Sequence, residues 1–310
     1  MNRNIRIVLA ILLTSVATSV SAQLLEVGEP TKVEITPTVG AVGSATLSPT
    51  GRSLFVTDPG YSGLTRIRLS DGTATVISTD EGAGYSPLIV DDDNVAYRRI
   101  TYTADNLKRT ELRRRDLSSG KDASIIGATR TLRGAVSPGD GSVYALDGTK
   151  VKTAKIAKGA VVAKRQPLLS IADRQLMLTV GSDTRCISPC GTDESYIWPS
   201  VSPDGRKALF FVCGEGAYVS NIDGSAPKFI GMVRAPRWLN NSIVVGMQDT
   251  DDGYVTTAST LVAVDIATLQ SQQLTDDRFI AMYPTTDKAA TKMAFTTPEG
   301  DVYIMDITIK

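Results

Sequence analysis

The sequence predicts an all-β protein: a six-bladed β-propeller in which each blade is a four-stranded antiparallel sheet. Three observations predict this fold. A strand–turn–strand phrase recurs along the chain at intervals of about 40–50 residues, which is typical of propellers. Turns rich in Gly, Pro, Asp or Asn separate the apolar or alternating segments of each copy. One further strand-like segment precedes the first copy, where it can complete the last one.

Residues 196–233 form the clearest copy. YIWPSVS alternates and ends at SPDG, a turn in which proline presets φ and glycine accepts a positive φ. KALFFV is a nearly continuous apolar run, as expected of a strand buried on both faces. AYVSNI then leads through a DG turn to PKFIGMV, the fourth strand. Because Ser and Asp bond their own backbone in such turns, we expect Ser202 and Asp204 to be turn-builders.

The weaker copies are assigned in chain order. The third range holds more strand than one blade needs, so 150–165 is taken as an inserted hairpin or extended edge and 175–188 as the blade's last two strands. Seven blades is the alternative, if 142–190 forms two degenerate blades. The six predicted blades cover residues 43–80, 85–128, 132–190, 196–233, 234–277 and 279–310.

The last blade has only three strands before Lys310. The segment 24–36, LLEVGEPTKVEIT, is predicted to supply the fourth. That pairing closes the ring and covers a sheet edge that would otherwise be a template for aggregation.

The first 22 residues are predicted to be a signal peptide. Arg3 and Arg6 precede an apolar run that fades into small and hydroxylated residues, and we expect cleavage after Ala22. The run is too short to cross a hydrocarbon core of about 30 Å, and no later apolar segment is long enough, so the mature chain should lack a transmembrane segment. We expect a periplasmic or secreted protein that is a monomer.

Composition excludes several function classes. Lys plus Arg equals Asp plus Glu at 33 each, which gives no indication of nucleic-acid binding. The chain has no histidine, so Ser-His-Asp and Cys-His nucleophile systems and His-based metal sites are excluded. No metal or cofactor is expected, and we predict that the protein is not an enzyme. A hydrolase that uses only carboxylates stays open.

Three cysteines, Cys186, Cys190 and Cys213, lie in a chain predicted to be exported, where disulfides persist. Propeller topology places Cys190, before the blade, and Cys213, after its second strand, at the same end of the blade. A Cys190–Cys213 disulfide is therefore predicted, with Cys186 left free. A Cys186–Cys190 bond is the competitor, although it would require an extended strand to bend.

The phrase PSVSPDGRKALFF…YVSNIDG resembles the repeat of the TolB-type propellers, in which a blade reads P-x-x-SPDG-x-x-apolar and then apolar-x-x-D-x-DG. The match is sharp at 196–233, fair at 45–79 and degenerate elsewhere. It implies a TolB-like six-bladed propeller that lacks the α/β domain that precedes the propeller in TolB itself. A role in the Tol-Pal system is therefore not carried over.

Propeller topology also predicts where a partner binds. Turns between strands one and two and between three and four lie on one face, which we call the turn face. Turns between strands two and three and the blade-to-blade connections lie on the other, the loop-rich face, where sequence can vary over a rigid frame. Aromatic and basic residues at blade entries fall on this face near the mouth of the central channel. The predicted partner-binding residues are Tyr85, Tyr196, Trp198, Arg234, Trp238, Arg278 and Tyr283.

The sequence therefore favours a non-catalytic, exported propeller that binds an envelope or secreted protein through its loop-rich face. Binding of a glycan or small ligand at the channel mouth is the alternative. Packing between adjacent blades is the favoured interpretation of Trp198 and Trp238 themselves, because bulky residues on inner strands usually pack there. The acidic loop 248–253, QDTDDG, could hold Ca²⁺ but lacks the full D-x-D-x-D-G spacing, which favours a solvated loop.

Overall fold

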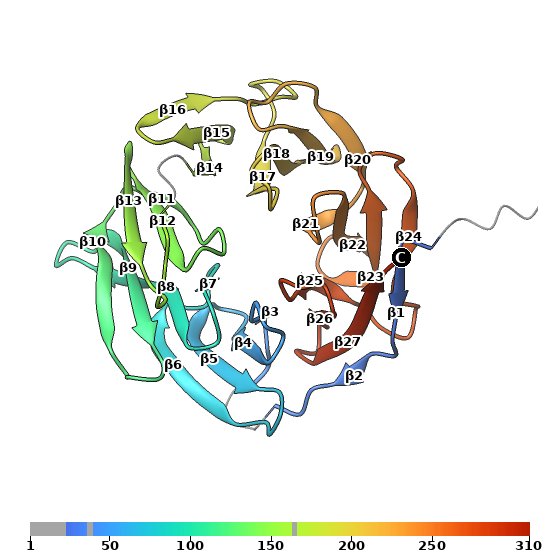
Figure 1. Ribbon diagram of the computed structural model, residues 1–310, viewed down its shortest axis with the longest axis horizontal. Coiled ribbons are helices and arrows are strands. Elements are labelled where there is room, and N and C mark those ends of the chain that lie inside the picture. Colours follow the sequence, from blue (N-terminus) through green and yellow to red (C-terminus); the bar gives the residue numbers. More distant parts are fainter. Residues whose placement is uncertain (1–22, 36–39, 163–165) are drawn as a thin grey trace, which may run out of the picture.

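The computed structural model describes residues 23–35, 40–162 and 166–310. The predicted signal peptide, residues 1–22, lies outside them. The regular secondary structure of the described residues is all β-strand, and the strands make seven sheets arranged as a ring (Figure 1). No helix in the described ranges is long and apolar enough to cross a membrane. The all-β propeller prediction is confirmed, and the blade count is the seven of the stated alternative, not six.

Four blades have four strands each. In each of them the first strand is innermost in the ring and the fourth strand is outermost (Figure 1). Blade 1 comprises β3 (Ser44–Leu47), β4 (Ser53–Thr57), β5 (Ser62–Arg68) and β6 (Ala74–Glu81), and blade 2 comprises β7 (Leu88–Ile89), β8 (Asn94–Tyr102), β9 (Lys108–Asp116) and β10 (Asp122–Thr129). Blade 5 comprises β17 (Tyr196–Val201), β18 (Lys207–Val212), β19 (Gly216–Asn221) and β20 (Lys228–Gly231), and blade 6 comprises β21 (Arg234–Trp238), β22 (Ile243–Asp251), β23 (Thr256–Asp265) and β24 (Ser271–Gln273).

Residues 132–190 form two three-stranded blades instead of one blade with an insertion. Blade 3 comprises β11 (Leu132–Val136), β12 (Ser142–Asp147) and β13 (Lys150–Lys155), and blade 4 comprises β14 (Pro167–Ala172), β15 (Gln175–Val180) and β16 (Asp183–Cys186). The hairpin predicted at 175–188 is therefore real, but it belongs to its own blade. The predicted inserted segment supplies β13, the third strand of blade 3.

The inner strand of blade 4 runs antiparallel to its neighbour in blade 5. The amide of Tyr196, at the start of β17, donates to the carbonyl of Arg174, just past the end of β14, at 2.9 Å. Gly205, beyond the end of β17, lies against Pro167 at the start of β14. Blade 3 ends on the turn face after three strands, so blade 4 can start there. Its own three strands then return the chain to the loop-rich face for blade 5.

The ring closes as predicted. Blade 7 comprises β25 (Met282–Thr286), β26 (Lys292–Thr296) and β27 (Val302–Ile309), and the N-terminal strands β1 (Leu25–Val27) and β2 (Thr31–Lys32) both pair with β27. The side chain of Gln272 in blade 6 also holds β1, because it accepts from the amides of Leu24 and Leu25 and donates to the carbonyl of Leu25.

Each interface between adjacent blades holds one hydrophobic cluster of the described residues. The largest joins blades 6 and 7 and includes Leu25 of the closing strand, which is fully buried. Burial of such a side chain contributes about 1.5–3 kcal/mol. The core of this protein is therefore distributed around the ring between the blades.

The SPDG turn of blade 5 has the predicted structural role. The Ser202 hydroxyl donates to Asp204 at 2.6 Å and accepts from the amide of Lys207, while Asp204 accepts from the amide of Arg206. These hydrogen bonds, the one from Ser202 first, lower the pKa of Asp204. Gly205 has φ +75°, which favours glycine.

Candidate functional site at the mouth of the ring

Three tyrosines lie together where blades 7, 1 and 2 meet the loop-rich face. Tyr283 lies on β25, Tyr61 lies in the turn between β4 and β5, and Tyr85 lies in the connection from blade 1 to blade 2. Their exposed fractions are 40%, 41% and 52%. Two of them were predicted to bind a partner, and Tyr61 was missed. With Arg98, described below, we call these residues the mouth cluster.

The tyrosines of the mouth cluster are coupled to one another. The rings of Tyr61 and Tyr85 have centroids 5.4 Å apart at an interplanar angle of 89°, an edge-to-face contact. Burial raises the pKa of Tyr61, and the neighbouring Tyr283 and Tyr85 raise that pKa further. The cluster therefore presents half-exposed aromatic surface in which the rings of Tyr61 and Tyr85 hold each other in place.

Arg98, on β8, completes the mouth cluster. Its guanidinium lies 5.2 Å from the centroid of the Tyr85 ring, and its Nη1 donates to the Tyr85 carbonyl at 2.9 Å. Burial lowers the pKa of Arg98, and only Tyr85 acts in the opposite direction. No described carboxylate forms an ion pair with Arg98. The mouth therefore carries a positive charge that aromatic stacking holds and no acid neutralises.

Strained backbone positions this cluster. Tyr61, Ser86 and Tyr283 have φ values of 57°, 48° and 53°, which are uncommon for residues other than glycine. At Tyr283 the β25–β26 register shifts between Met282 and Thr285, so the strand bulges there. A bulge turns a side chain away from its regular direction, and such strain is often found at functional sites.

The two tryptophans occupy a different environment. Trp198 and Trp238 are half-buried against the cluster between blades 5 and 6, and Trp198 makes an edge-to-face contact with Phe211 at 5.4 Å. Both tryptophans therefore pack between adjacent blades, as one of the two sequence interpretations expects. The indole Nε1 of Trp238 is buried and has no hydrogen-bond partner among the described residues.

Tyr196 cannot contact a partner. It is 1% exposed, and its hydroxyl accepts from the amide of Cys190 and donates to the carbonyl of Gly191. Burial raises the pKa of Tyr196 to about 12. The predicted binding role is therefore wrong for this residue, because it holds the entry loop of blade 5 against the core.

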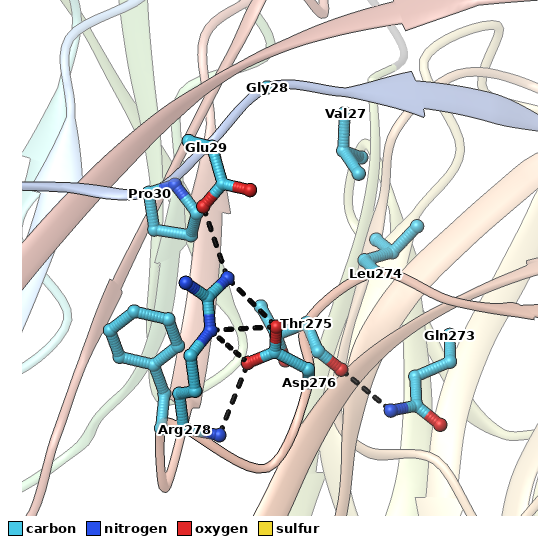
Figure 2. A pocket seen from close by; sticks show the side chains of 10 residues that line it. Val27, Gly28, Glu29, Pro30, Gln273, Leu274, Thr275, Asp276 and Arg278 are labelled. Atoms are coloured by element: carbon cyan, nitrogen blue, oxygen red, sulfur yellow. Dashed lines mark hydrogen bonds and ion pairs between the residues drawn. The ribbon is translucent and has the colours of Figure 1, made fainter.

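Arg234 and Arg278 form ion pairs with carboxylates outside the mouth cluster. Arg278 contacts Asp276 at 2.8 Å and Glu29 at 3.0 Å beside an open depression of about 320 Å³ at the ring-closure seam (Figure 2). β1 and β24 lie at the outer edge of the ring there (Figure 1). Arg278 thus joins the closing segment to blade 6.

Arg234 starts β21 and pairs with Asp249 at 2.9 Å. The Asp249 side chain is only 2% exposed, and its Oδ1 has no partner among the described residues. Burial raises the pKa of Asp249, against the opposing effect of Arg234. A second depression, of about 270 Å³, lies between Arg234 and the tip of the β22–β23 hairpin.

All three cysteines, each within the described ranges, are free thiols, so the predicted Cys190–Cys213 disulfide is not formed in the structure. The amide of Cys213 donates a hydrogen bond to the carbonyl of Ser195. Cys190 instead packs against the hydrophobic cluster between blades 4 and 5. Burial first, then Glu215 and Glu194, raise the pKa of Cys190 to about 11, which makes its thiol a weak nucleophile.

The acidic loop 248–253 uses its carboxylates to shape its own turn. Asp251 accepts from the amide of Gly253, and Asp252 accepts from the amides of Tyr254 and Val255. Among the described residues, no group of three or more Cys, Asp or Glu side chains is arranged to hold a metal ion.

Comparisons with solved structures show the same fold. The chain is similar to U3-55K, with 10% identity over 92% of this chain and 99% of that one and a TM-score of 0.57. It is also similar to the WD40 β-propeller domain of Doa1, with 11% identity over 90% and 97% of the two chains and a TM-score of 0.58. An oligogalacturonate lyase in complex with manganese aligns with 15% identity over 86% and 76%, at a TM-score of 0.49.

No family model and no curated protein matches the sequence. At these identities the structural likeness defines the class, a β-propeller, and nothing about activity.

Proposed function

We propose that this protein is an exported, non-catalytic propeller that binds a protein partner of the cell envelope or a secreted protein. The mouth cluster is the binding site in this proposal. The observation that carries it is the group of three half-exposed tyrosines with Arg98 stacked on one of them.

The chemistry of the mouth cluster suits a protein partner. Tyrosine and arginine are enriched among the few residues that carry most of the binding energy at protein interfaces. Tyrosine offers a large contact area and loses little conformational entropy, since only two side-chain torsions become fixed. The edge-to-face contact and the bonds from Arg98 already fix part of the cluster, which lowers the entropy cost of binding.

The TolB-like assignment belongs to the same proposal. It is supported by the SPDG turn of blade 5, whose Ser and Asp side chains make the backbone bonds that the repeat implies. Export, and a site of action in the periplasm or outside the cell, are supported by the charged, apolar and small-residue order of the first 22 residues.

The test is a crosslinking pull-down from an envelope fraction with the mature protein as bait. The test variant carries Tyr61→Ala, Tyr85→Ala and Tyr283→Ala. The matched control is Tyr254→Ala, which removes a tyrosine that is 95% exposed on the β22–β23 hairpin. Circular dichroism and thermal unfolding check that each variant is folded.

We expect a specific partner that binds the wild type and the Tyr254 variant equally and the triple variant at least tenfold more weakly. A partner that binds the triple variant as tightly as the wild type would refute the mouth as its site. If no specific partner is captured by the wild type, the protein-binding proposal fails, and screens for glycans and small ligands at the mouth follow.

A further inference from the structure

Arg237 lies on the innermost strand of blade 6, opposite Val245 on β22. Both faces of blade 6 pack against neighbouring blades through hydrophobic clusters, and β21 is the innermost strand of this blade (Figure 1). Arg237 is nevertheless an exposed residue, next to the buried Pro236. Its side chain therefore reaches solvent at the inner edge of the ring.

The corresponding residue of blade 7 shows which neighbour this position of a blade meets. Thr285 also follows the proline of a bulged inner strand, and its hydroxyl accepts from the amide of Leu47 on the inner strand of blade 1 at 3.2 Å. At this position of blade 7 the side chain therefore points along the inner edge of the ring toward the next blade, where it is buried. In blade 6 the position is held by a longer, charged side chain.

The guanidinium of Arg237 has no ion pair and no side-chain hydrogen bond among the described residues. The surrounding protein lowers the pKa of Arg237, and no carboxylate acts against that effect. A cation that is crowded by protein, reached by water and left without a counterion costs free energy unless a ligand uses it.

Other donors on the inner strands also lack partners. The indole Nε1 of Trp238 and the hydroxyl of Ser200 are buried without a hydrogen-bond partner among the described residues. Arg133, on the inner strand β11, is exposed and has no ion pair in the described part of the chain. The exposed residues Arg133 and Arg237 therefore give the inner strands positive charge without a described counterion, while the Trp238 and Ser200 donors lie buried beside them.

We infer that the centre of the ring is a carboxylate-binding site in which Arg237 binds the anionic group. A guanidinium forms two parallel hydrogen bonds with a planar carboxylate. One uncompensated cation on this strand matches a monoanion better than a phosphate, which several cations usually share. The site goes beyond the proposed docking at the mouth and does not depend on it, because its residues are separate from the mouth cluster.

The chain's only two tryptophans, Trp198 and Trp238, lie on β17 and β21, so intrinsic fluorescence reports on this part of the ring. The mature protein is titrated with acetate, with hexaglutamate and with inorganic phosphate at constant ionic strength. The variants are Arg237→Gln and Arg237→Lys. The matched control is Arg206→Gln, which removes an exposed arginine of the turn face that has no ion pair with any described residue.

We expect a saturable fluorescence change with a carboxylate probe in the wild type and the Arg206 variant. Binding should be at least tenfold weaker in Arg237→Gln and intermediate in Arg237→Lys, which keeps the charge but not the planar fork. A response to acetate would identify a free small acid as sufficient, and a response to hexaglutamate alone would identify a peptide carboxylate. Both outcomes support the site.

Three outcomes would overturn the inference. They are no saturable response to either carboxylate, an undiminished response in Arg237→Gln, and tighter binding of phosphate than of both carboxylates. Thermal unfolding adds an independent criterion. If Arg237 is kept for a ligand, Arg237→Gln should melt at or above the wild-type temperature without any probe, and a clear decrease would show that Arg237 is structural instead.

Discussion

At the scale of single residues, the inner strands of blades 5, 6 and 7 each contain one residue with a positive φ, a backbone conformation that favours glycine. Trp198, Ala235 and Tyr283 have φ values of 51°, 46° and 53°, and each is followed by proline. Each lies at a register shift in which the inner strand gains one residue over its neighbour. Three successive blades therefore repeat the same bulge. Because the bulge recurs, it belongs to the structure of these blades, and in blade 7 it sets the direction of the Tyr283 side chain in the mouth cluster.

Asp249 provides a residue-scale prediction about pH. Burial raises its pKa in the folded state, so over a range of pH the native protein binds a proton that the unfolded chain has released. Stability from this group is present at low pH and is lost as pH rises through the folded pKa. Asp249→Asn, which cannot ionise, should therefore increase the free energy of unfolding by about 1 kcal/mol at neutral pH. The gain should vanish below the unfolded pKa of about 4.

Urea unfolding of both proteins between acid and neutral pH measures this difference. Asp251→Asn is the control, since Asp251 faces the same Arg234 at 3.7 Å but has a side chain that is 51% exposed. It should change stability by less than about 0.5 kcal/mol. If Asp249→Asn is less stable than the wild type at neutral pH, the bond to Arg234 outweighs the burial of the charge.

Part of the mouth cluster could be predicted from sequence, and part could not. Tyr85 lies two residues before Pro87 and Tyr283 lies directly before Pro284, both at blade entries, so topology alone assigns them to the loop-rich face. Tyr61 follows the Asp58-Pro59-Gly60 turn and could have been found from the same topology, as a turn between strands two and three. Arg98 lies inside a strand, and only the folded register brings it beside Tyr85.

At the scale of elements, the blade count illustrates a limit of pattern reading. Strands are visible in the sequence as alternation and turn residues, but strand direction is not. Blades 3 and 4 have three strands each. Because the inner strand of blade 4 runs in the reversed direction, the chain returns to the loop-rich face in time to start blade 5 as a regular blade. The hydrogen bond from Tyr196 to Arg174, which shows this reversed direction, joins residues of two different blades. A repeat period cannot encode such a contact.

An element-scale prediction concerns the attachment of the closing strand. Gln272 makes three hydrogen bonds to the backbone of Leu24 and Leu25, at 2.7, 2.8 and 2.7 Å. Gln272→Ala should lower the free energy of unfolding by about 1–3 kcal/mol, because the partly buried amides and carbonyl lose their partner. Gln273→Ala is the matched control on the same strand, where one bond joins Gln273 to the Thr275 carbonyl. Equal losses in the two variants by urea unfolding would contradict a special role for Gln272.

At the scale of the whole molecule, stability depends on closure of the ring. Each described cluster joins two neighbouring blades, so an open ring loses one whole interface. The seam lies in blade 7, where β1 and β2 pair with β27 although they are far from it in the sequence. Leu25, fully buried in the blade 6–blade 7 cluster, makes this pairing part of the core as well as of the sheet.

Removal of residues 23–32 from the mature chain should therefore lower the free energy of unfolding by about 3–5 kcal/mol, since loss of a buried leucine alone costs about that much. It should also expose β27 as an edge and promote association, measurable by size-exclusion chromatography. A peptide of residues 23–32, added in trans, should restore the melting temperature as its concentration rises, because it binds only the folded ring. The same peptide with Leu25→Asp should fail, as the carboxylate cannot enter the cluster. An unchanged melting temperature after the deletion, or equal rescue by both peptides, would show that the ring holds without its N-terminal strand.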